Sequence, residues 1–220
     1  MSIRKSTRIV CPMCDERGAF CSPEDALHIA VSDFVRRQDA AHASSIRAAP
    51  WWQDLKRARS DWRVDNLESG AGSFGTMHWR QRRELLPTHY VCGLLSPFYA
   101  EVMIAPDRRR MTWAVSFSPF TDNATGRGQG GAIAAVFDLA CAMLGHLSRG
   151  GNTPTQRLEV KYRKPLLPIP GVFRLDVEVL PDGDGTRRVC TVATLSDGNG
   201  TVFDTADVVL VDIGKSKSKL

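Results

Sequence analysis

An isolated aspartate lies in the middle of an apolar stretch of the chain. From 132 to 144 the sequence reads AIAAVFDLACAML, and Asp138 is the only residue in this run that is not apolar. A carboxylate buried among apolar side chains costs free energy unless it is hydrogen-bonded or takes part in chemistry. Asp138 is therefore a candidate general base.

Two glycines stand directly before this stretch, in Gly128-Gln129-Gly130-Gly131. Glycine lets the chain turn tightly, and the free N–H groups at the start of a helix can hold an anion. Acyl transfer develops negative charge on a carbonyl oxygen, which such N–H groups stabilise. A base and an oxyanion site could thus lie on one short element.

Strand patterns flank the apolar stretch on both sides. The pattern of apolar, β-branched and aromatic residues predicts strands at 98–105, 111–118, 155–163, 171–180, 187–196 and 201–212. The segments at 182–185 and 197–200, DGDG and DGNG, predict hairpin turns. A helix that is apolar almost all round must be covered on most sides. We therefore expect an α+β fold in which a curved antiparallel sheet wraps around one central helix.

The first part of the chain has a different pattern. Ser22 and Pro23 are typical of a helix start, and Trp51, Trp52 and Leu55 predict a second helix over about 50–62. A glycine-rich loop follows at 69–73. We expect a mainly helical N-terminal extension at 1–88, the sheet-and-helix domain at 89–213, and a flexible tail at 214–220.

Composition limits the possible partners. The 220 residues are 43% apolar and 24% charged, with a formal net charge of +5, which is typical of a globular protein with a sizeable core. The mild positive charge suits a phosphate-bearing ligand and is far weaker than the signature of nucleic-acid binding. The apolar run at 132–144 is too short to cross a bilayer. We expect neither a nucleic-acid partner nor a membrane span.

The cysteines indicate no metal site. Cys11, Cys14 and Cys21 lie close together, but the second Cys or His pair that a zinc site needs is missing. The N-terminus has no long apolar segment of the kind found in secretory signals. We therefore expect free thiols in a reducing compartment.

Several of these residues together resemble a known family. Gly130-Gly131, Asp138 seven residues after Gly131, and Thr155 seven residues before Tyr162-Arg163-Lys164-Pro165 resemble the hotdog-fold acyl-CoA thioesterases, especially the eukaryotic type with an N-terminal extension. The resemblance covers about 89–213. It implies hydrolysis of acyl-CoA without a cofactor, by a homodimer or dimer of dimers whose active sites lie where two sheets join.

The resemblance also implies roles for single residues. Asp138 would be the general base or nucleophile, and the N–H of Gly131, next to Gly130, would polarise the thioester carbonyl. Thr155 would come from the partner subunit and position the water or the carboxylate, with Thr153 as a competing candidate. Gln129 replaces the histidine that the family usually has, and it can donate a hydrogen bond but cannot titrate.

Basic residues on the strand that follows could contact the phosphates of CoA. Arg157, Lys161, Arg163 and Lys164 are the candidates. A solvated strand face explains any one of them equally well.

The chain ends in Ser218-Lys219-Leu220, a peroxisomal address that an import receptor reads. We expect a peroxisome or similar organelle, and otherwise the cytoplasm. The alternative is a chance match within a Lys/Ser-rich tail.

Two other functions remain open. One is a hotdog protein that binds acyl-CoA without catalysis, with Gln129 marking the lost activity. The other is an enoyl-CoA hydratase, for which His146 would have to pair with Asp138.

Overall fold

The computed structural model describes residues 37, 40–66, 98–123, 125–166, 169–181 and 187–214. Several sequence-based predictions lie outside these residues: the helix start at Ser22, the glycine-rich loop at 69–73, the turn at 182–185, the N-terminal cysteines and the tripeptide at 218–220.

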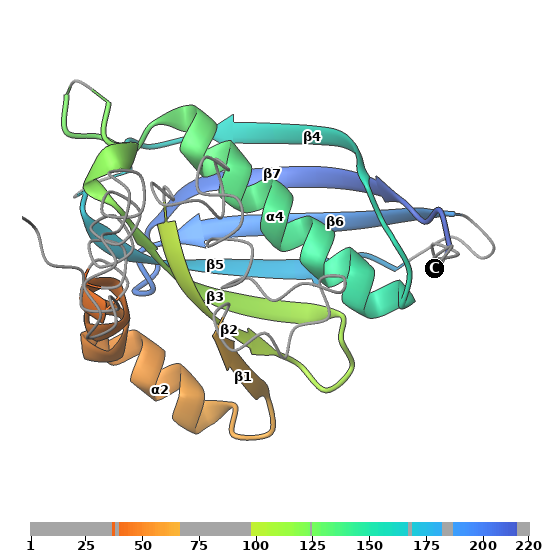
Figure 1. Ribbon diagram of the computed structural model, residues 1–220, viewed down its shortest axis with the longest axis horizontal. Helices are drawn as coiled ribbons and strands as arrows, with labels where there is room; N and C mark the ends of the chain where they lie inside the picture. Colours follow the sequence, from red (N-terminus) through yellow and green to blue (C-terminus); the bar gives the residue numbers. More distant parts are fainter. Residues whose placement is uncertain are drawn as a thin grey trace, which may run out of the picture.

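Seven strands form one antiparallel sheet in the order β1-β2-β3-β5-β6-β7-β4 (Figure 1). Their bounds are β1 (Arg63–Asn66), β2 (Phe98–Ile104), β3 (Arg110–Phe117), β4 (Thr155–Tyr162), β5 (Gly171–Val179), β6 (Arg188–Ser196) and β7 (Val202–Val211). The six strands predicted from the sequence are all present. In the β6–β7 turn, Asp197 accepts hydrogen bonds from the N–H groups of Asn199 and Thr201.

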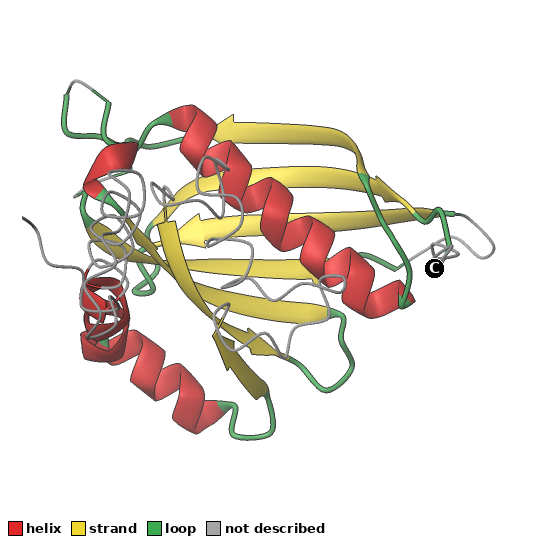
Figure 2. Cartoon of the chain, in the orientation of Figure 1, coloured by secondary structure: helices red, strands yellow, loops and turns green. Residues whose placement is uncertain are grey.

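Helix α4 (Gly130–Arg149) crosses one face of this sheet (Figures 1 and 2). Gln129 caps its start, and Gly150 ends it in the left-handed conformation at φ 67°, with its N–H bonded to the carbonyl of His146. Glycine adopts that conformation without a steric penalty. By length and composition alone α4 could cross a membrane, but half of that stretch is buried inside this structure.

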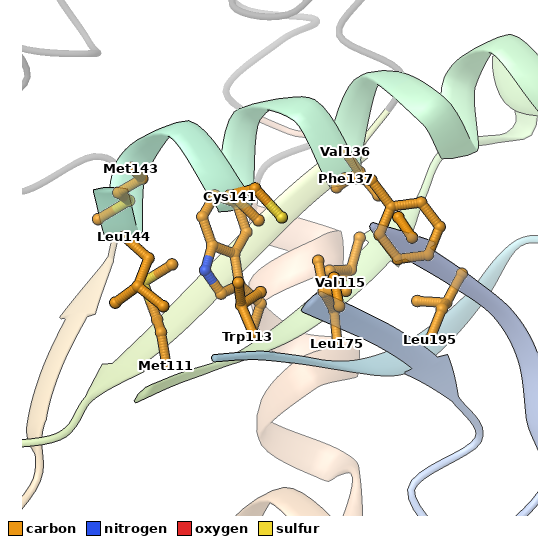
Figure 3. Packing of buried hydrophobic residues seen from close by; sticks show 14 of the residues in the cluster. Met111, Trp113, Val115, Val136, Phe137, Cys141, Met143, Leu144, Leu175 and Leu195 are labelled. Carbon is orange, nitrogen blue, oxygen red and sulfur yellow. The ribbon is translucent and has the colours of Figure 1, made fainter. Parts of the chain in front are cut away.

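The main core lies between α4 and the sheet. Figure 3 shows α4 side chains directed at strand residues on the face that we call the inner face. All of these side chains are almost fully buried: Val136, Phe137, Cys141, Met143 and Leu144 from α4, and Met111, Trp113, Val115, Leu175 and Leu195 from the strands. Burial of each large apolar side chain contributes about 1.5–3 kcal/mol. The predicted hotdog architecture, a curved antiparallel sheet around a central apolar helix, is confirmed.

The N-terminal helices pack on the other side of the sheet, the outer face. Residues 40–48 are helical, and α2 (Pro50–Ala58) follows. Ile46 and Trp52 are fully buried against Tyr99, Met103 and Ala114. This second, smaller core joins the N-terminal segment to β2 and β3.

Two details of this segment differ from the sequence-based prediction. The helix predicted over 50–62 ends at Ala58, and the next residues turn so that β1 can begin at Arg63 and pair with β2. Trp62 therefore lies outside the helix, where the Arg59 guanidinium packs over its ring at 4.2 Å. Strand β1 was not predicted, because it is only four residues long and gains its partner from a distant part of the chain.

Candidate active site

Asp138 and Thr155 meet on the inner face of the sheet. The hydroxyl of Thr155 donates a 2.7 Å hydrogen bond to Oδ1 of Asp138. Both side chains are half-buried, Asp138 in the middle of α4 and Thr155 at the start of β4. A carboxylate held in this way keeps one oxygen available while its orientation is fixed.

The expectation that Thr155 comes from the partner subunit is wrong, because this bond lies within one chain. After α4 ends at Arg149, five residues reverse the chain and β4 runs back along the helix. At the far end of β4, the hydroxyl of Tyr162 donates to the carbonyl of Gly130 at 2.7 Å. Both ends of β4 are therefore joined to α4.

Thr153, the competing candidate, does not reach Asp138. Its side chain is buried, and its hydroxyl donates to the backbone carbonyl of Ala142 at 3.4 Å. The structure thus assigns the contact with the carboxylate to Thr155.

Gln129 acts as the N-cap of α4. Its Oε1 accepts the N–H of Ala132 at 2.7 Å, and its own N–H donates to the carbonyl of Thr121 at 2.7 Å. Capping needs an acceptor and no titration, so glutamine can replace histidine here and still hold the start of the helix. The side-chain Nε2 group remains as a donor.

Gly131 leaves room for this cap. A Cβ atom at position 131 would lie 2.9 Å from Oε1 of Gln129, so a side chain there would shift the end of the flexible Gln129 side chain. Gly130 packs instead against Tyr162, whose ring would lie 3.4 Å from a Cβ at that position. The two glycines therefore serve different neighbours.

The N–H of Gly131 is open to a ligand. Residue 131 is exposed, and its N–H donates no hydrogen bond to any residue in the described part of the chain. The first N–H groups of a helix lack partners within the helix and carry partial positive charge. This N–H can therefore stabilise a developing oxyanion.

Gly131 and Asp138 lie on one side of α4. Seven residues correspond to nearly two full turns, so the two positions differ by only about 20° around the axis and about 10 Å along it. The side chains around them are apolar and only partly buried: Ala134, Ala135, Leu139 and Ala142. A water-activating carboxylate and an oxyanion donor thus share one largely apolar, half-open surface.

Cys141, one turn after Asp138, is a poor nucleophile. Its thiol is fully buried, and burial raises its pKa to about 12, with the charge of Asp138 adding to the shift. The thiol is therefore neutral at physiological pH and acts as a packing group. Cys141 and Cys190 are both free cysteines, as expected.

The basic candidates lie away from this surface. Arg157 and Lys161 are exposed on β4 and alternate with the residues that face α4, and Arg163 is exposed directly after the strand. Lys161 forms ion pairs with Asp207 at 3.0 Å and Glu159 at 3.6 Å. Lys164 is exposed just after the strand. Within one protomer, the structure does not bring these four residues to Asp138.

Asp204, a buried carboxylate, was not identified from the sequence as a candidate site residue. Asp204 on β7 is 1% exposed, and burial raises its pKa to about 6. It occupies the strand face that Ala206, Val208 and Leu210 share in the core. The alternation of β7 places a charged residue on the inner face, and this signal could have revealed it from sequence.

No group of three or more His, Cys, Asp or Glu side chains that could hold a metal ion occurs in the described ranges. The N-terminal cysteines lie outside those ranges.

No protein-family model and no curated protein matches this sequence. Several solved structures resemble its fold. A hypothetical thioesterase with coenzyme A from Streptococcus pneumoniae TIGR4 is 15% identical, with a TM-score of 0.44 over 49% of this chain and 83% of that chain. A protein from Streptococcus mutans UA159 bound to acetyl-CoA is 16% identical, with a TM-score of 0.46 over 54% of this chain and 90% of that chain. A phenylacetic acid degradation-related protein from Ralstonia eutropha JMP134 is 22% identical, with a TM-score of 0.42 over 46% of this chain and 75% of that chain.

Proposed function

We propose that this protein is an acyl-CoA thioesterase, which hydrolyses an acyl-CoA thioester to a carboxylic acid and CoA. The observation that carries the proposal is the Asp138–Thr155 hydrogen bond of 2.7 Å on the same side of α4 as the open N–H of Gly131. The resemblance of the sequence motifs to acyl-CoA thioesterases indicates CoA as the thiol carrier.

The chemistry follows from these three groups. The N–H of Gly131 donates to the thioester carbonyl oxygen and stabilises the negative charge that forms there. Asp138, oriented by Thr155, takes a proton from a water molecule while the water oxygen attacks the carbonyl carbon. The tetrahedral intermediate then expels the CoA thiolate, which receives the proton from Asp138.

A homodimer would complete this site. Strand β4 is the last strand of the sheet, so one row of its backbone groups has no neighbouring strand within the described part of the protomer. Beside it, the half-buried apolar side chains of Ala134, Leu139 and Ala142 remain partly open on α4. A second copy paired along β4 would extend the sheet and cover these groups.

The two rival functions are less well supported. A hydratase would use Asp138 together with His146, but His146 is eight positions after Asp138, which corresponds to about 80° around the helix axis, whereas Gly131 and Asp138 differ by only about 20°. A non-catalytic binder would not need a carboxylate that a threonine orients next to a free N–H group.

The test is turnover of a panel of acyl-CoA substrates of increasing chain length, followed by release of free thiol. We expect thiol release by the wild type and a loss of about 10²–10⁴-fold in Asp138→Asn, because this change removes the base while keeping the shape. Glu159→Gln, an exposed carboxylate on β4, is the matched control and should retain full activity.

Other outcomes would contradict the proposal. A hydratase would consume enoyl-CoA without releasing thiol, and a binding protein would consume nothing. An Asp138→Asn variant that folds and keeps most of its thiol-release rate would remove Asp138 from the mechanism.

A further inference from the structure

Asp204 faces the core rather than the solvent. On β7 it precedes Ala206, Val208 and Leu210 on the strand face that packs against α4. Across the sheet it pairs with Leu195 of β6 on one side and Tyr162 of β4 on the other. Its position is therefore at the end of the inner face where α4 begins.

One oxygen of this carboxylate has no partner. Oδ1 accepts the backbone N–H of Arg163 at 3.2 Å. Oδ2 is buried and has no hydrogen-bond partner among the residues that the structure describes. A buried acceptor left unsatisfied costs free energy, and a carboxylate costs more than a neutral group. Such a group calls for a donor that the described residues do not supply.

Tyr162 links this oxygen to the candidate active site. Tyr162 is 54% exposed as a residue, its ring packs against Gly130, and its hydroxyl donates to the Gly130 carbonyl. Tyr162 lies directly opposite Asp204 in the β4–β7 pair. Burial and the charge of Asp204 both raise the pKa of Tyr162. Gly131 is the next residue. An acyl chain whose carbonyl lies at the Gly131 N–H therefore starts beside Tyr162, the residue that pairs with Asp204 across β4 and β7.

We propose that Asp204 is a specificity residue that accepts a hydrogen bond from a hydroxyl group on the acyl part of the substrate. This inference rests on the proposed function, since it takes the thioester carbonyl to lie at Gly131. Two neighbours of Asp204 on the inner face, Leu195 and Ala206, are apolar, and the hydroxyl of the third, Tyr162, is bonded to Gly130. They could satisfy none of the remaining donors of an ammonium group, whereas a hydroxyl needs only one acceptor.

The experiment compares hexanoyl-CoA with its 3-, 4-, 5- and 6-hydroxy derivatives. Dissociation constants are measured by calorimetry in the Asp138→Asn background, so that no probe is consumed. We expect at least one hydroxy isomer to bind about 10–100-fold more tightly than hexanoyl-CoA, as for a hydrogen bond to a charged group. Adding Asp204→Asn should reduce this preference to within about 3-fold, because the amide presents a donor where Oδ2 was an acceptor.

Two further variants keep the test decisive. Asp204→Ala replaces Asp204→Asn if the amide variant does not fold. Glu178→Gln removes an exposed carboxylate from the outer face of β5 and should leave the preference unchanged.

The subsite is overturned if no hydroxy isomer binds more tightly than hexanoyl-CoA, or if the preference survives both Asp204 variants. It is also overturned if none of the probes binds. Thiol release by the wild type is measured separately and reports on the proposed function alone. A preference that depends on Asp204 without any thiol release would leave the subsite standing and end the thioesterase proposal.

Discussion

The two faces of the sheet differ in how their buried polar side chains are hydrogen-bonded. On the outer face, polar groups bond to one another: Trp52 to Glu101 at 2.9 Å, His42 to Ser116 at 2.8 Å, and Arg59 to Thr112, which bonds to Asp176 at 2.6 Å. On the inner face, Trp113 Nε1 and Asp204 Oδ2 are buried with no hydrogen-bond partner among the residues that the structure describes, and Asp138 is held by Thr155.

This difference distinguishes polar side chains that stabilise the fold from polar side chains that remain able to bind a ligand. The outer-face bonds join the N-terminal segment to β2, β3 and β5, and each donor meets an acceptor within the chain. The inner-face carboxylates keep acceptor oxygens that no described residue uses. An unused buried acceptor lowers stability, and for this reason we propose that Asp204 binds a ligand.

The largest expected effect concerns the outer face. Trp52→Ala should lower the free energy of unfolding by about 3–5 kcal/mol, because a fully buried aromatic side chain is removed and leaves a cavity. The measurement is urea unfolding, combined with thiol release per folded molecule, which should stay close to the wild-type value. Trp52→Phe serves as a milder control. Activity lost without a loss of stability would show that the faces are not separate in function.

The next effect concerns the start of α4. Gly131→Pro should lower kcat by about 10²–10³-fold, because proline offers no N–H to the oxyanion yet is tolerated in the first turn of a helix. Gly131→Ala keeps the N–H and only displaces the Gln129 cap. It should cost far less activity. Equal losses in the two folded variants would exclude the Gly131 N–H as the donor.

Asp204 should make stability depend on pH. Its pKa is raised from 3.8 to about 6 by burial, so between these values the folded state binds more protons than the unfolded state. Stability should therefore fall as the pH rises from about 4 to about 6. Asp204→Asn removes this loss and should be more stable than the wild type above pH 6, by about 2–3 kcal/mol at most.

Urea unfolding of both proteins at pH 4, 5, 6 and 7.5 checks this prediction. The two curves of stability against pH should converge near pH 4 and separate towards neutral pH. Parallel curves would mean that Asp204 titrates alike in the folded and unfolded chain.

The smallest effect concerns the partner of the base. Thr155→Val should lower thiol release by about 10-fold, as expected for one lost hydrogen bond of about 1.5 kcal/mol. Thr155→Ser keeps the hydroxyl and should restore most of the rate. If the valine and serine variants behave alike, the hydroxyl does not orient Asp138.

Local patterns in the sequence were enough to predict the six long strands, the central helix and the unusual position of Asp138. Alternation along a strand, glycine-rich turns and an apolar run are properties of neighbouring residues. These patterns predict the fold class because an apolar helix and strands with one apolar face can bury their apolar surfaces in only a few ways. Gly131 and Asp138 could be paired for the same reason, since both lie on one helix.

Contacts between distant segments were decided only by the tertiary structure. The reversal after Arg149 brought Thr155 to Asp138 within one chain, and pairing with β2 turned four residues after Trp62 into a strand. For Asp204, the alternation of β7 marks the strand face on which it lies, but its burial came from the neighbouring strands β6 and β4, which pair with that end of β7. Burial and hydrogen-bond partners depend on which segments pack together, and that is set by the sum of many long-range contacts rather than by any local pattern.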